Sequence, residues 1–524
     1  MKKNKKKKEE YKPSKWLYVI MFTLPLIFTT LMVTKLDNDI WYLLSEGRYI
    51  VQNGIYHIDP LSMHQGLQVT VQNWLSASLF WIIYNGFGEA GLFTMVLVCN
   101  FFICLLLYKI CMLISDKNRI LSLIVMFVSD ISLASHYIVS RPQIISFIIL
   151  LSLIYVLELY IKNDNPKYLI WIPILSLMEV NLHASLWWML FLFMLPYVID
   201  SFKIPILNTQ GYRKKPLFIA ILIAFLVGFI NPYGYKAITF IFTSYGDKYM
   251  HIYINELLPF SFNNALSKHM FILILATGLL YTIFRNGNIR IRYICLYCGT
   301  MILGFMSVKG FSHFLVVSFF PFAYFFKDIF PNDFSDLPYA FKKVLNIFYC
   351  IIGLGCISLF IYCYIKDIPN MKLTHNADEA MQMIVKYGNS ETDTVYSSFN
   401  NGGFVEFYGF KPYIDPRAEV YLKVNNKKAD IFEENYLIQH GSGDIDEFMK
   451  KYDFTFMLIE YNDFLFNQME NYEDYLVIYD NTEKGYRLYA KSEKFSEEEI
   501  ANIKKTYTEA LDKAKADSNS NNVN

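Results

Sequence analysis

Long apolar runs recur through the first 365 residues of this 524-residue chain. A helix needs about 20 mainly apolar residues to cross the roughly 30 Å hydrocarbon core of a membrane. We predict eleven spans, near residues 16–34, 90–114, 119–137, 143–161, 168–181, 184–199, 216–231, 269–284, 292–308, 312–327 and 345–365. Around Asn181-Leu182-His183 the pattern fits two short helices with a tight turn, or one helix and a re-entrant segment. The first run lacks a small-residue cleavage site, so we interpret it as a span and not as a signal peptide.

The charged residues are divided unevenly along the chain. Residues 1–365 carry 30 Lys and Arg against 18 Asp and Glu, whereas residues 366–524 carry 18 against 29. Short loops rich in Lys and Arg stay in the cytoplasm. Alternate loops, beginning with residues 1–15, hold 22 of these positive residues, and the other loops before residue 366 hold 7. The N-terminus is therefore predicted to be cytoplasmic, and eleven crossings place the acidic C-terminal part outside.

The predicted fold class is an α-helical polytopic membrane protein with about eleven transmembrane helices and a C-terminal extracytoplasmic α/β domain. This class excludes an all-soluble enzyme, and the absence of one broad basic face excludes a nucleic-acid partner. We divide the chain into a basic cytoplasmic N-terminus (1–15), a membrane domain (16–365) with a large first external loop (35–89), an α/β domain (366–495), and a charged helix with a disordered tail (496–524).

Short alternating elements indicate the α/β character of the C-terminal part. The predicted helices are 377–388 and 444–452, and the predicted strands are 394–399, 411–415, 454–459, 475–480 and 485–490. Ser496 and Glu499 are spaced as a capping box that opens the last helix. All nine histidines lie at or beyond the predicted outer membrane face, and all eight cysteines lie within predicted spans. We interpret Cys295-x-x-Cys298 as helix packing, because it lies inside an apolar run.

The first external loop is dense in chemical groups, which include Asp37, Asp39, His57 and Asp59. Residues 39–52 have the pattern of an amphipathic helix that lies on a membrane surface. Asp37 and Asp39 follow the first span directly. A carboxylate there can accept a proton from a sugar hydroxyl, or hold a divalent cation against a phosphate. The alternative is that both residues are hydrated ends of a span.

A second set of polar groups lies at other outer span ends. Its members include Arg141, Asn181, His183, Glu256, Lys309 and His313. Cationic side chains there suit an anion such as a lipid-linked phosphate, and the alternative is that each extends to lipid headgroups. Asp130 and Glu158 lie within spans, and we assign them no role beyond a structural one.

Taken together, the motifs of this chain resemble those of a known protein family. Asp37-x-Asp39-x-Trp41, Gly47-Arg48, Asp59-Pro60 and Trp74-Leu75 resemble the first external loop of GT-C-type polytopic glycosyltransferases, and most closely those of a poorly characterised bacterial branch. The later segments that agree in order are Ser140-Arg141-Pro142-Gln143, Asn181-Leu182-His183, Asn231-Pro232-Tyr233-Gly234, Asn401-Gly402-Gly403-Phe404 and Asp415-Pro416-Arg417-Ala418-Glu419. The resemblance covers residues 35–490. Relatives often have His two positions after the Trp, where this chain has Leu43.

The resemblance implies transfer of a sugar from a polyprenyl-phosphate donor in the membrane lipid to an outer glycan, lipid or protein acceptor, with inversion. Asp37 or Asp39 would act as base or contact a divalent cation. The donor phosphate would meet Arg141, His183, Lys309 and His313. On a strand, Asp415, Arg417 and Glu419 would share one face. They would then either bind acceptor or form a buried ion-pair network.

Two other functions compete with glycosyl transfer. One is a non-enzymatic membrane protein whose external domain binds a cell-surface polymer or partner, and the missing His favours it. The other is a lipid or polymer transporter, which is disfavoured because the sequence has no internal repeat of the transporter kind. The sequence also has no glycine-rich phosphate loop such as GxGxxG. A lipid phosphate is already an activated leaving group, so a glycosyltransferase of this kind needs no nucleotide.

Overall fold

Apolar helices form the larger of two units in the computed structural model, which describes residues 14–33, 36–204, 207–284, 289–329, 339–367, 375–481 and 483–505. The first unit comprises Met1–Asp37, Ile83–Phe240 and His251–Lys372, and the second comprises Asn38–Ile82, Ile241–Met250 and Leu373–Asn524. The basic N-terminal segment up to residue 13 and the predicted tail beyond residue 505 lie outside the described residues.

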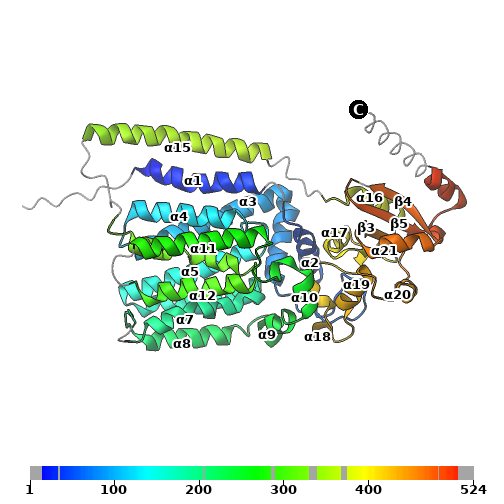
Figure 1. Ribbon diagram of the computed structural model, residues 1–524, viewed down its shortest axis with the longest axis horizontal. Helices are drawn as coiled ribbons and strands as arrows, with labels where there is room; N and C mark the ends of the chain where they lie inside the picture. Colours follow the sequence, from blue (N-terminus) through cyan, green and yellow to red (C-terminus); the bar gives the residue numbers. More distant parts are fainter. Residues whose placement is uncertain are drawn as a thin grey trace, which may run out of the picture. The chain divides into compact units, whose positions relative to one another are not determined.

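The helices of the first unit run alongside one another (Figure 1). They are α1 (Lys15–Met32), α4 (Arg119–Ala134), α5 (Gln143–Asn163), α6 (Trp171–Leu182), α7 (Trp187–Asp200), α8 (Lys214–Val227), α11 (Ala265–Phe284), α12 (Ile291–Met306), α13 (Phe311–Val317), α14 (Phe320–Phe325) and α15 (Tyr339–Asp367), with the short 3₁₀ helices η1 (Pro166–Ile170), η2 (Ala184–Leu186) and η3 (Asn255–Leu257). Helix α3 (Trp74–Ile114) begins in the second unit and ends in the first, and α9 (Tyr235–Ser244) and α10 (Lys248–Tyr253) contribute to both.

Each of the eleven predicted spans corresponds to helix. Five described helices are long and apolar enough to cross a membrane, namely Lys15–Met32, Trp74–Ile114, Gln143–Asn163, Ala265–Ile283 and Phe341–Lys366. Three other segments are apolar but shorter, namely Ala184–Asp200, Ile291–Met306 and Phe311–Phe325. Around His183 the chain forms two short helices, because α6 ends at Leu182 and His183 leaves helical geometry (φ −158°, ψ 72°).

A glycine breaks the longest helix. The 41 residues of α3 would extend about 60 Å as one straight helix, twice the thickness of a bilayer core. Gly88 interrupts it with φ 61° and ψ −155°, a backbone region that glycine enters without a steric penalty. The part that follows, 89–114, contains the predicted span 90–114, and the part before it belongs largely to the second unit.

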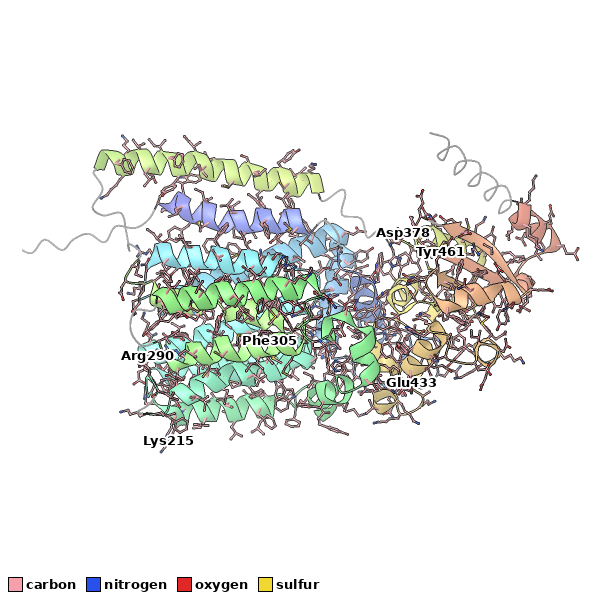
Figure 2. All side chains as sticks on the ribbon, in the orientation of Figure 1. Lys215, Arg290, Phe305, Asp378, Glu433 and Tyr461 are labelled. Carbon is pink, nitrogen blue, oxygen red and sulfur yellow. The ribbon has the colours of Figure 1, made fainter. Side chains whose placement is uncertain are left out.

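The loops that the charge count assigns to the cytoplasm meet at one end of the first unit. Asp116 pairs with both Lys162 (3.5 Å) and Lys327 (2.8 Å). Asp164 pairs with Arg213 at 2.8 Å, and Arg290 donates to the Asn208 side chain at 3.0 Å. Lys215 and Arg290 lie at this end in Figure 2, and Phe305 lies farther towards the other. These contacts therefore bring the five loops together at one end of the first unit.

A buried ion-pair network closes the same end of the unit. Arg292 donates to Glu158 at 2.9 and 3.2 Å and to Asp200 at 2.6 Å. Tyr197 and Tyr293 donate to the Glu158 carboxylate at 3.0 and 3.2 Å. Buried charges persist only when they are paired and hydrogen-bonded. The contacts of Glu158 therefore explain why it lies inside an apolar segment, and they join α5, α7 and α12.

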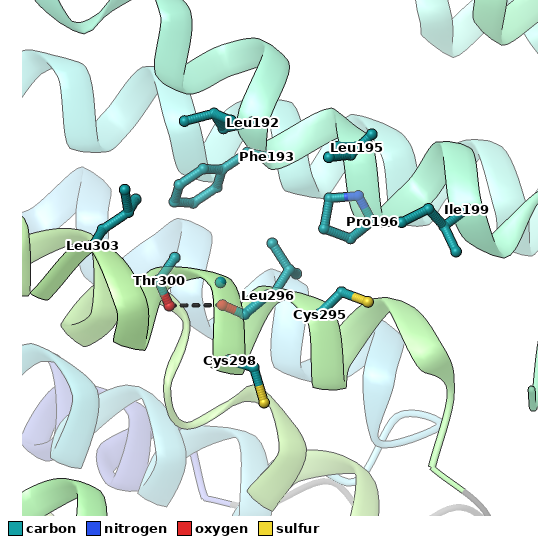
Figure 3. A pocket seen from close by; sticks show the side chains of 11 residues that line it. Leu192, Phe193, Leu195, Pro196, Ile199, Cys295, Leu296, Cys298, Thr300 and Leu303 are labelled. Carbon is teal, nitrogen blue, oxygen red and sulfur yellow. Dashed lines mark hydrogen bonds between the residues drawn. The ribbon is translucent and has the colours of Figure 1, made fainter. Parts of the chain in front are cut away.

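An apolar cavity of about 350 Å³ lies between α7 and α12. Figure 3 shows its lining, which is Leu192, Phe193, Leu195, Pro196, Ile199, Cys295, Leu296, Cys298, Gly299, Thr300 and Leu303. Thr300 donates back to the Leu296 carbonyl at 2.6 Å. The lining has no acidic or basic side chain, and Cys295 and Cys298 are free thiols. The cavity therefore has no charged group that could hold an ionic ligand.

The second unit contains a five-stranded sheet of order β2-β1-β3-β5-β4. Its strands are β1 (Thr394–Ser397), β2 (Lys411–Pro412), β3 (Phe456–Glu460), β4 (Tyr475–Asn481) and β5 (Tyr486–Lys491). Strands β2, β1 and β3 are mutually parallel, and β5 is antiparallel to β3 and β4. Residues Phe456–Ile459 of β3 are fully buried, as expected for a central strand with both faces covered. The predicted α/β character is confirmed.

The remaining helices of the second unit are α2 (Ile40–Asn53), α16 (Asp378–Tyr387), α17 (Phe399–Phe407), α18 (Lys423–Asn426), α19 (Ile431–Gln439), α20 (Ile445–Tyr452) and α21 (Phe464–Gln468), with the 3₁₀ helices η5 (Ala418–Tyr421), η6 (Met469–Asn471) and η7 (Ser492–Lys494). The predicted capping box is present, because the Glu499 amide donates to Ser496 Oγ at 3.3 Å and the Ser496 amide donates to Glu499 at 2.9 Å. Residues 497–505 that follow are helical.

The amphipathic helix predicted at 39–52 exists as α2, but its apolar face is covered by protein. Trp41 packs edge-on against Phe404 and Phe407 of α17, with ring centroids 4.6 and 4.9 Å apart. A Cβ atom on Gly47 would lie only 2.1 Å from the Ala77 carbonyl oxygen of α3. The expected position on a membrane surface, with the apolar face in lipid, is therefore wrong for these residues.

Candidate functional site: a charged cluster at helix ends

Two ion pairs of Arg141 hold together three segments of the first unit. Arg141 Nε lies 2.8 Å from Asp37 Oδ1, and its Nη1 lies 2.5 Å from Glu256 Oε1. The Asp37 amide also donates to Ser140 Oγ at 3.2 Å. The Arg141 and Asp37 side chains are 22% and 21% exposed, so solvent or a ligand can reach the pair. Arg141 occupies the turn that leads into α5, where Pro142 is the N-cap.

Lys309 joins the same group through Glu256. The Lys309 amide donates to the Glu256 carbonyl at 2.9 Å, in the turn between α12 and α13. Burial raises the pKa of the Glu256 carboxyl, but the positive charges of Arg141 and Lys309 outweigh burial, and the pKa lies below its usual value. Glu256 is therefore ionised at neutral pH, and two carboxylates and two cations face one another.

Two buried histidines complete the cluster. His183 follows α6, is 7% exposed, and has Nδ1 hydrogen-bonded to Ser146 Oγ at 3.0 Å. His313 lies in the first turn of α13 and is 3% exposed. Its Nε2 has no hydrogen-bond partner within the described part of the chain. Lys309 and His313 both interact electrostatically with His183. We call Asp37, Arg141, His183, Glu256, Lys309 and His313 the charged cluster.

The charged cluster brings together all four residues that the sequence assigns to a donor phosphate. They come from the turn before α5, the end of α6, and the turn and helix after α12. In a bundle whose helices alternate in direction, these positions lie at the end opposite the Arg292 network. The structure adds one feature that the sequence did not reveal: Arg141 is paired with two carboxylates, those of Asp37 and Glu256.

Asp39 belongs to the second unit, where it precedes α2. Its carbonyl accepts a hydrogen bond from the Leu43 amide at 3.2 Å, and its side chain does not cap the helix. The two other candidate residues of the first loop differ in their exposure to solvent. His57 is exposed, whereas Asp59 is 5% exposed and pairs with Arg417.

Arg417 is the centre of a buried network in the second unit. It donates to Asp415 at 2.9 and 2.7 Å, to Asp59 at 2.8 Å and to Glu406 at 2.6 Å. Glu46 of α2 lies 3.8 Å away. Arg417 and these four acids are each at most 5% exposed. For Asp415 and Arg417, the contacts agree with the alternative of a buried ion-pair network.

The predicted strand 411–415 ends early, because β2 comprises Lys411–Pro412, and it does not continue through Asp415, Arg417 and Glu419. The chain bends after Ile414, and residues Ala418–Tyr421 form η5. Glu419 therefore does not share a face with Asp415 and Arg417, and it accepts instead from Gln72 Nε2 at 3.4 Å. The Arg417 amide also donates to Asp415 Oδ1 at 2.8 Å, across this bend.

Two of the acids around Arg417 retain protons near neutral pH. Burial raises the pKa of Glu46 to about 8. Burial and the charge of Asp415 raise the pKa of Glu406 well above its usual value. For Asp415, burial is outweighed by the charge of Arg417, and the pKa lies below its usual value. The protons on Glu46 and Glu406 therefore remove two of the four negative charges that would otherwise surround the single guanidinium of Arg417.

The second unit should lose stability as pH rises. An acid whose pKa is higher in the folded state keeps a proton that the unfolded chain releases, so stability falls between the unfolded and folded pKa values. For Glu46 the interval runs from 4.5 to about 8. We expect the melting temperature of the full chain in detergent to fall from about pH 5 to about pH 8, and to fall less in Glu46→Gln. An equal slope in the variant would assign the effect to other groups.

The other motif residues have structural contacts. Asn181 donates to the Leu177 and Ile230 carbonyls at 2.9 and 3.0 Å. Asn231 donates to Gly228 and Gly234 at 2.8 and 3.1 Å, which closes the turn after α8. A Cβ atom on Gly402 would lie 1.9 Å from the Ile414 carbonyl oxygen. Glycine at this position lets α17 pack directly against the backbone that leads to Asp415 and Arg417.

Sequence reasoning missed Glu46, Glu406 and Ser146. Glu46 carried a usable signal, because it lies on the apolar face of α2 between Leu43 and Ile50, where a carboxylate needs a buried partner. Ser146 follows Gln143 by one helical turn and so shares its face. Glu406 had no comparable signal in the sequence.

The described residues do not fit the divalent cation that the resemblance suggests. Carboxylate ligands usually surround such a cation in groups. Neither Asp37 nor Asp39 belongs to a group of three or more His, Cys, Asp or Glu residues able to hold a metal ion in the described ranges. The described carboxylate contact of Asp37 Oδ1 is with Arg141. We therefore derive no step through a metal.

The long apolar helices and the sheet-containing second unit define a polytopic α-helical membrane protein with a small α/β unit. No protein-family model matches the chain, and no curated protein matches its sequence. Solved structures do match its fold. The crystal structure of the Archaeoglobus fulgidus oligosaccharyltransferase in the apo form has a TM-score of 0.57 at 14% identity, over 86% of this chain and 70% of that chain.

A second crystal structure of that oligosaccharyltransferase, tethered by a disulfide bond to an acceptor peptide with the NVT sequon, has a TM-score of 0.52 at 15% identity. It covers 91% of this chain and 74% of that chain. The chain therefore shares the fold of this oligosaccharyltransferase.

Proposed function

We propose that the protein is an inverting membrane glycosyltransferase of the GT-C type. It moves a sugar from a polyprenyl-phosphate donor to a glycan, lipid or protein on the outer face of the membrane. The observation that carries the proposal is the charged cluster, in a chain with the fold of an oligosaccharyltransferase. In this proposal the N-terminus is cytoplasmic, residues 16–365 form the membrane domain, and residues 366–495 form the extracytoplasmic domain.

The residues of the charged cluster have different roles in binding the donor. Arg141 is paired with Asp37 and Glu256. We therefore assign it two roles, which are to position Asp37 and to contact the phosphate. Lys309, His183 and His313 supply further positive or hydrogen-bonding groups for the phosphate, which prefers charge-assisted contacts. The orphaned Nε2 of buried His313 supports this assignment, because buried polar atoms without partners are rare in proteins.

The transfer step requires one base. The acceptor hydroxyl oxygen attacks the anomeric carbon on the face opposite the phosphate, the bond from that carbon to the phosphate oxygen breaks, and polyprenyl phosphate leaves with the bonding electrons. We assign the hydroxyl proton to Asp39, whose part-exposed carboxylate closely follows the first predicted span.

Transfer from a labelled donor tests the proposal. Membranes from cells that overproduce the chain are incubated with polyprenyl phosphate carrying a radiolabelled sugar, and label leaving the polyprenyl phosphate is measured. Lys309→Met should lower kcat/KM by about 10- to 100-fold, the value of one hydrogen bond to a charged group. Lys268→Met is the matched control, because Lys268 is exposed in the first turn of α11. Retention of all label by the wild-type chain would favour a non-enzymatic binder.

A further inference from the structure

The apolar cavity between α7 and α12 has the size and lining of a site for hydrocarbon. Its volume is about 350 Å³, whereas an apolar protein cavity of about 150 Å³ stays dry and takes up benzene. On that scale the cavity holds roughly a dozen carbon atoms. Its lining has no acidic or basic side chain, so a charged group would lose its hydration there without compensation. The cavity therefore suits the hydrocarbon part of a ligand.

The cavity is open at the side of the first unit. Leu192 and Leu195 of α7 are 46% and 52% exposed, and Cys298 and Gly299 of α12 are exposed as well. Both helices belong to apolar segments that lie in the proposed membrane domain. A hydrocarbon chain can therefore enter between the two helices from the lipid without crossing water.

A single aromatic ring joins the cavity to the charged cluster. Phe193 of α7 lines the cavity and is 1% exposed. Its ring packs edge-on against the imidazole of His313, with the ring centroids 6.3 Å apart. In Figure 3, Phe193 and Leu303 lie at one end of the lining, and Ile199 lies at the other. The end of the cavity at Phe193 is therefore next to a residue of the charged cluster.

His313 supplies a polar atom that calls for a ligand. Its Nε2 has no hydrogen-bond partner within the described residues, although the side chain is buried. Its Nδ1 lies 3.5 Å from Ser312 Oγ, so in the tautomer with the proton on Nε2 the unpaired atom is a donor. Lys309 interacts electrostatically with the same ring. A phosphate oxygen is an acceptor that satisfies both groups.

We propose that the cavity holds the part of the polyprenyl chain next to the donor phosphate, and that Phe193 separates this hydrocarbon from the phosphate at His313 and Lys309. The inference rests on the proposed function. A chain gains little free energy by leaving lipid for an equally apolar cavity. The cavity instead fixes where the chain lies, which raises the effective concentration of the phosphate at the cluster. The site therefore prefers an isoprenoid phosphate to a phosphate without hydrocarbon.

Two phosphates test the cavity without sugar transfer. The purified full chain in detergent is titrated by calorimetry with farnesyl phosphate and with inorganic phosphate. Gly299→Phe should raise the Kd for farnesyl phosphate by about 10-fold or more, the usual effect of a misfit in a hydrophobic pocket, and should leave the Kd for inorganic phosphate unchanged. Gly299 lines the cavity, and a Cβ atom there meets nothing within 4 Å. Gly355→Phe in α15 is the matched control, because a Cβ atom at Gly355 also meets nothing.

Thiol alkylation gives a second measurement on the unaltered chain. Cys298 lines the cavity and is an exposed free thiol, whereas Cys356 is a half-buried free thiol of α15. Farnesyl phosphate at ten times its Kd leaves about one site in eleven open. The reaction of Cys298 with N-ethylmaleimide should therefore slow by about 10-fold, and that of Cys356 should not change. Peptide mass spectrometry measures both rates.

The outcomes separate the two proposals. Equal Kd values for farnesyl phosphate in the wild type and both phenylalanine variants, an equal loss in both variants, or unprotected Cys298 would overturn the role of the cavity and leave the glycosyltransferase proposal intact. Equal protection of Cys298 by a phosphatidylglycerol with straight acyl chains would assign the cavity to ordinary lipid and also overturn it. Failure of the wild type to bind either phosphate would overturn the phosphate site and this inference with it. Where Gly299→Phe does not yield folded protein, the protection of Cys298 decides.

Discussion

Asp39→Asn is expected to lower sugar transfer by about 10²- to 10⁴-fold, the usual contribution of a general base. The amide keeps the size of the side chain and loses its ability to accept the hydroxyl proton. The fold should not change, because Asp39 is part-exposed and does not cap α2. The measurement is the initial rate of label transfer, together with the yield of folded chain in the membrane fraction.

Two further variants, Asp37→Asn and Glu89→Gln, show whether the loss of transfer is specific to Asp39. Asp37 is paired with Arg141. Asp37→Asn should therefore raise the KM for the donor, because the Arg141 guanidinium loses a charged partner that positions it. Glu89 is an acid of the same predicted external loop, adjacent to the break at Gly88, and its variant should transfer sugar at the wild-type rate. Full activity in Asp39→Asn would remove Asp39 from the mechanism. A shared loss in all three variants would point to a general defect of the loop.

The helices and strands of the chain follow from local patterns, and so they could be predicted. Apolar runs of about 20 residues mark membrane helices wherever they occur, and residues Phe456–Ile459 of β3 are all apolar. One helix that was not predicted is α17, where Gly402 and Gly403 disfavour a helix by propensity. Their small size is needed instead for packing, since Gly402 lies against the Ile414 carbonyl. Tertiary contact overrode local preference at this position.

The pairings within the candidate site could not be predicted. Arg141 reads as a single cation at a span end, and nothing local indicates that Asp37 and Glu256, each over 100 residues away, neutralise it. The same holds for Arg417, whose partner Asp59 is 358 residues distant. The charge of a side chain and its position along a predicted span can be read from the sequence. The partner of that charge depends on how helices and loops meet in the fold, and no alternation or spacing in the sequence encodes this.

Arg417→Met is expected to unfold the second unit or to leave it barely stable. Removing one partner of a buried ion pair costs about 3–5 kcal/mol, a large share of the roughly 5–15 kcal/mol that holds a typical domain folded. Here the loss leaves Asp59, Asp415, Glu406 and Glu46 with no cation among them. The check is the protease concentration that cleaves residues 375–505 in the full chain, with Lys411→Met, an exposed cation of β2, as control.

Neutralising the acids should restore part of this loss. The cost of Arg417→Met is mainly that of uncompensated buried carboxylates, so adding Asp59→Asn and Asp415→Asn should raise protease resistance above that of the single variant. The single variant should also weaken further as pH rises, because Glu46 and Glu406 then lose their protons. If the triple variant is no more resistant than Arg417→Met, the guanidinium stabilises the unit through its packing and not through its charge. In that case the four acids are held by contacts other than Arg417.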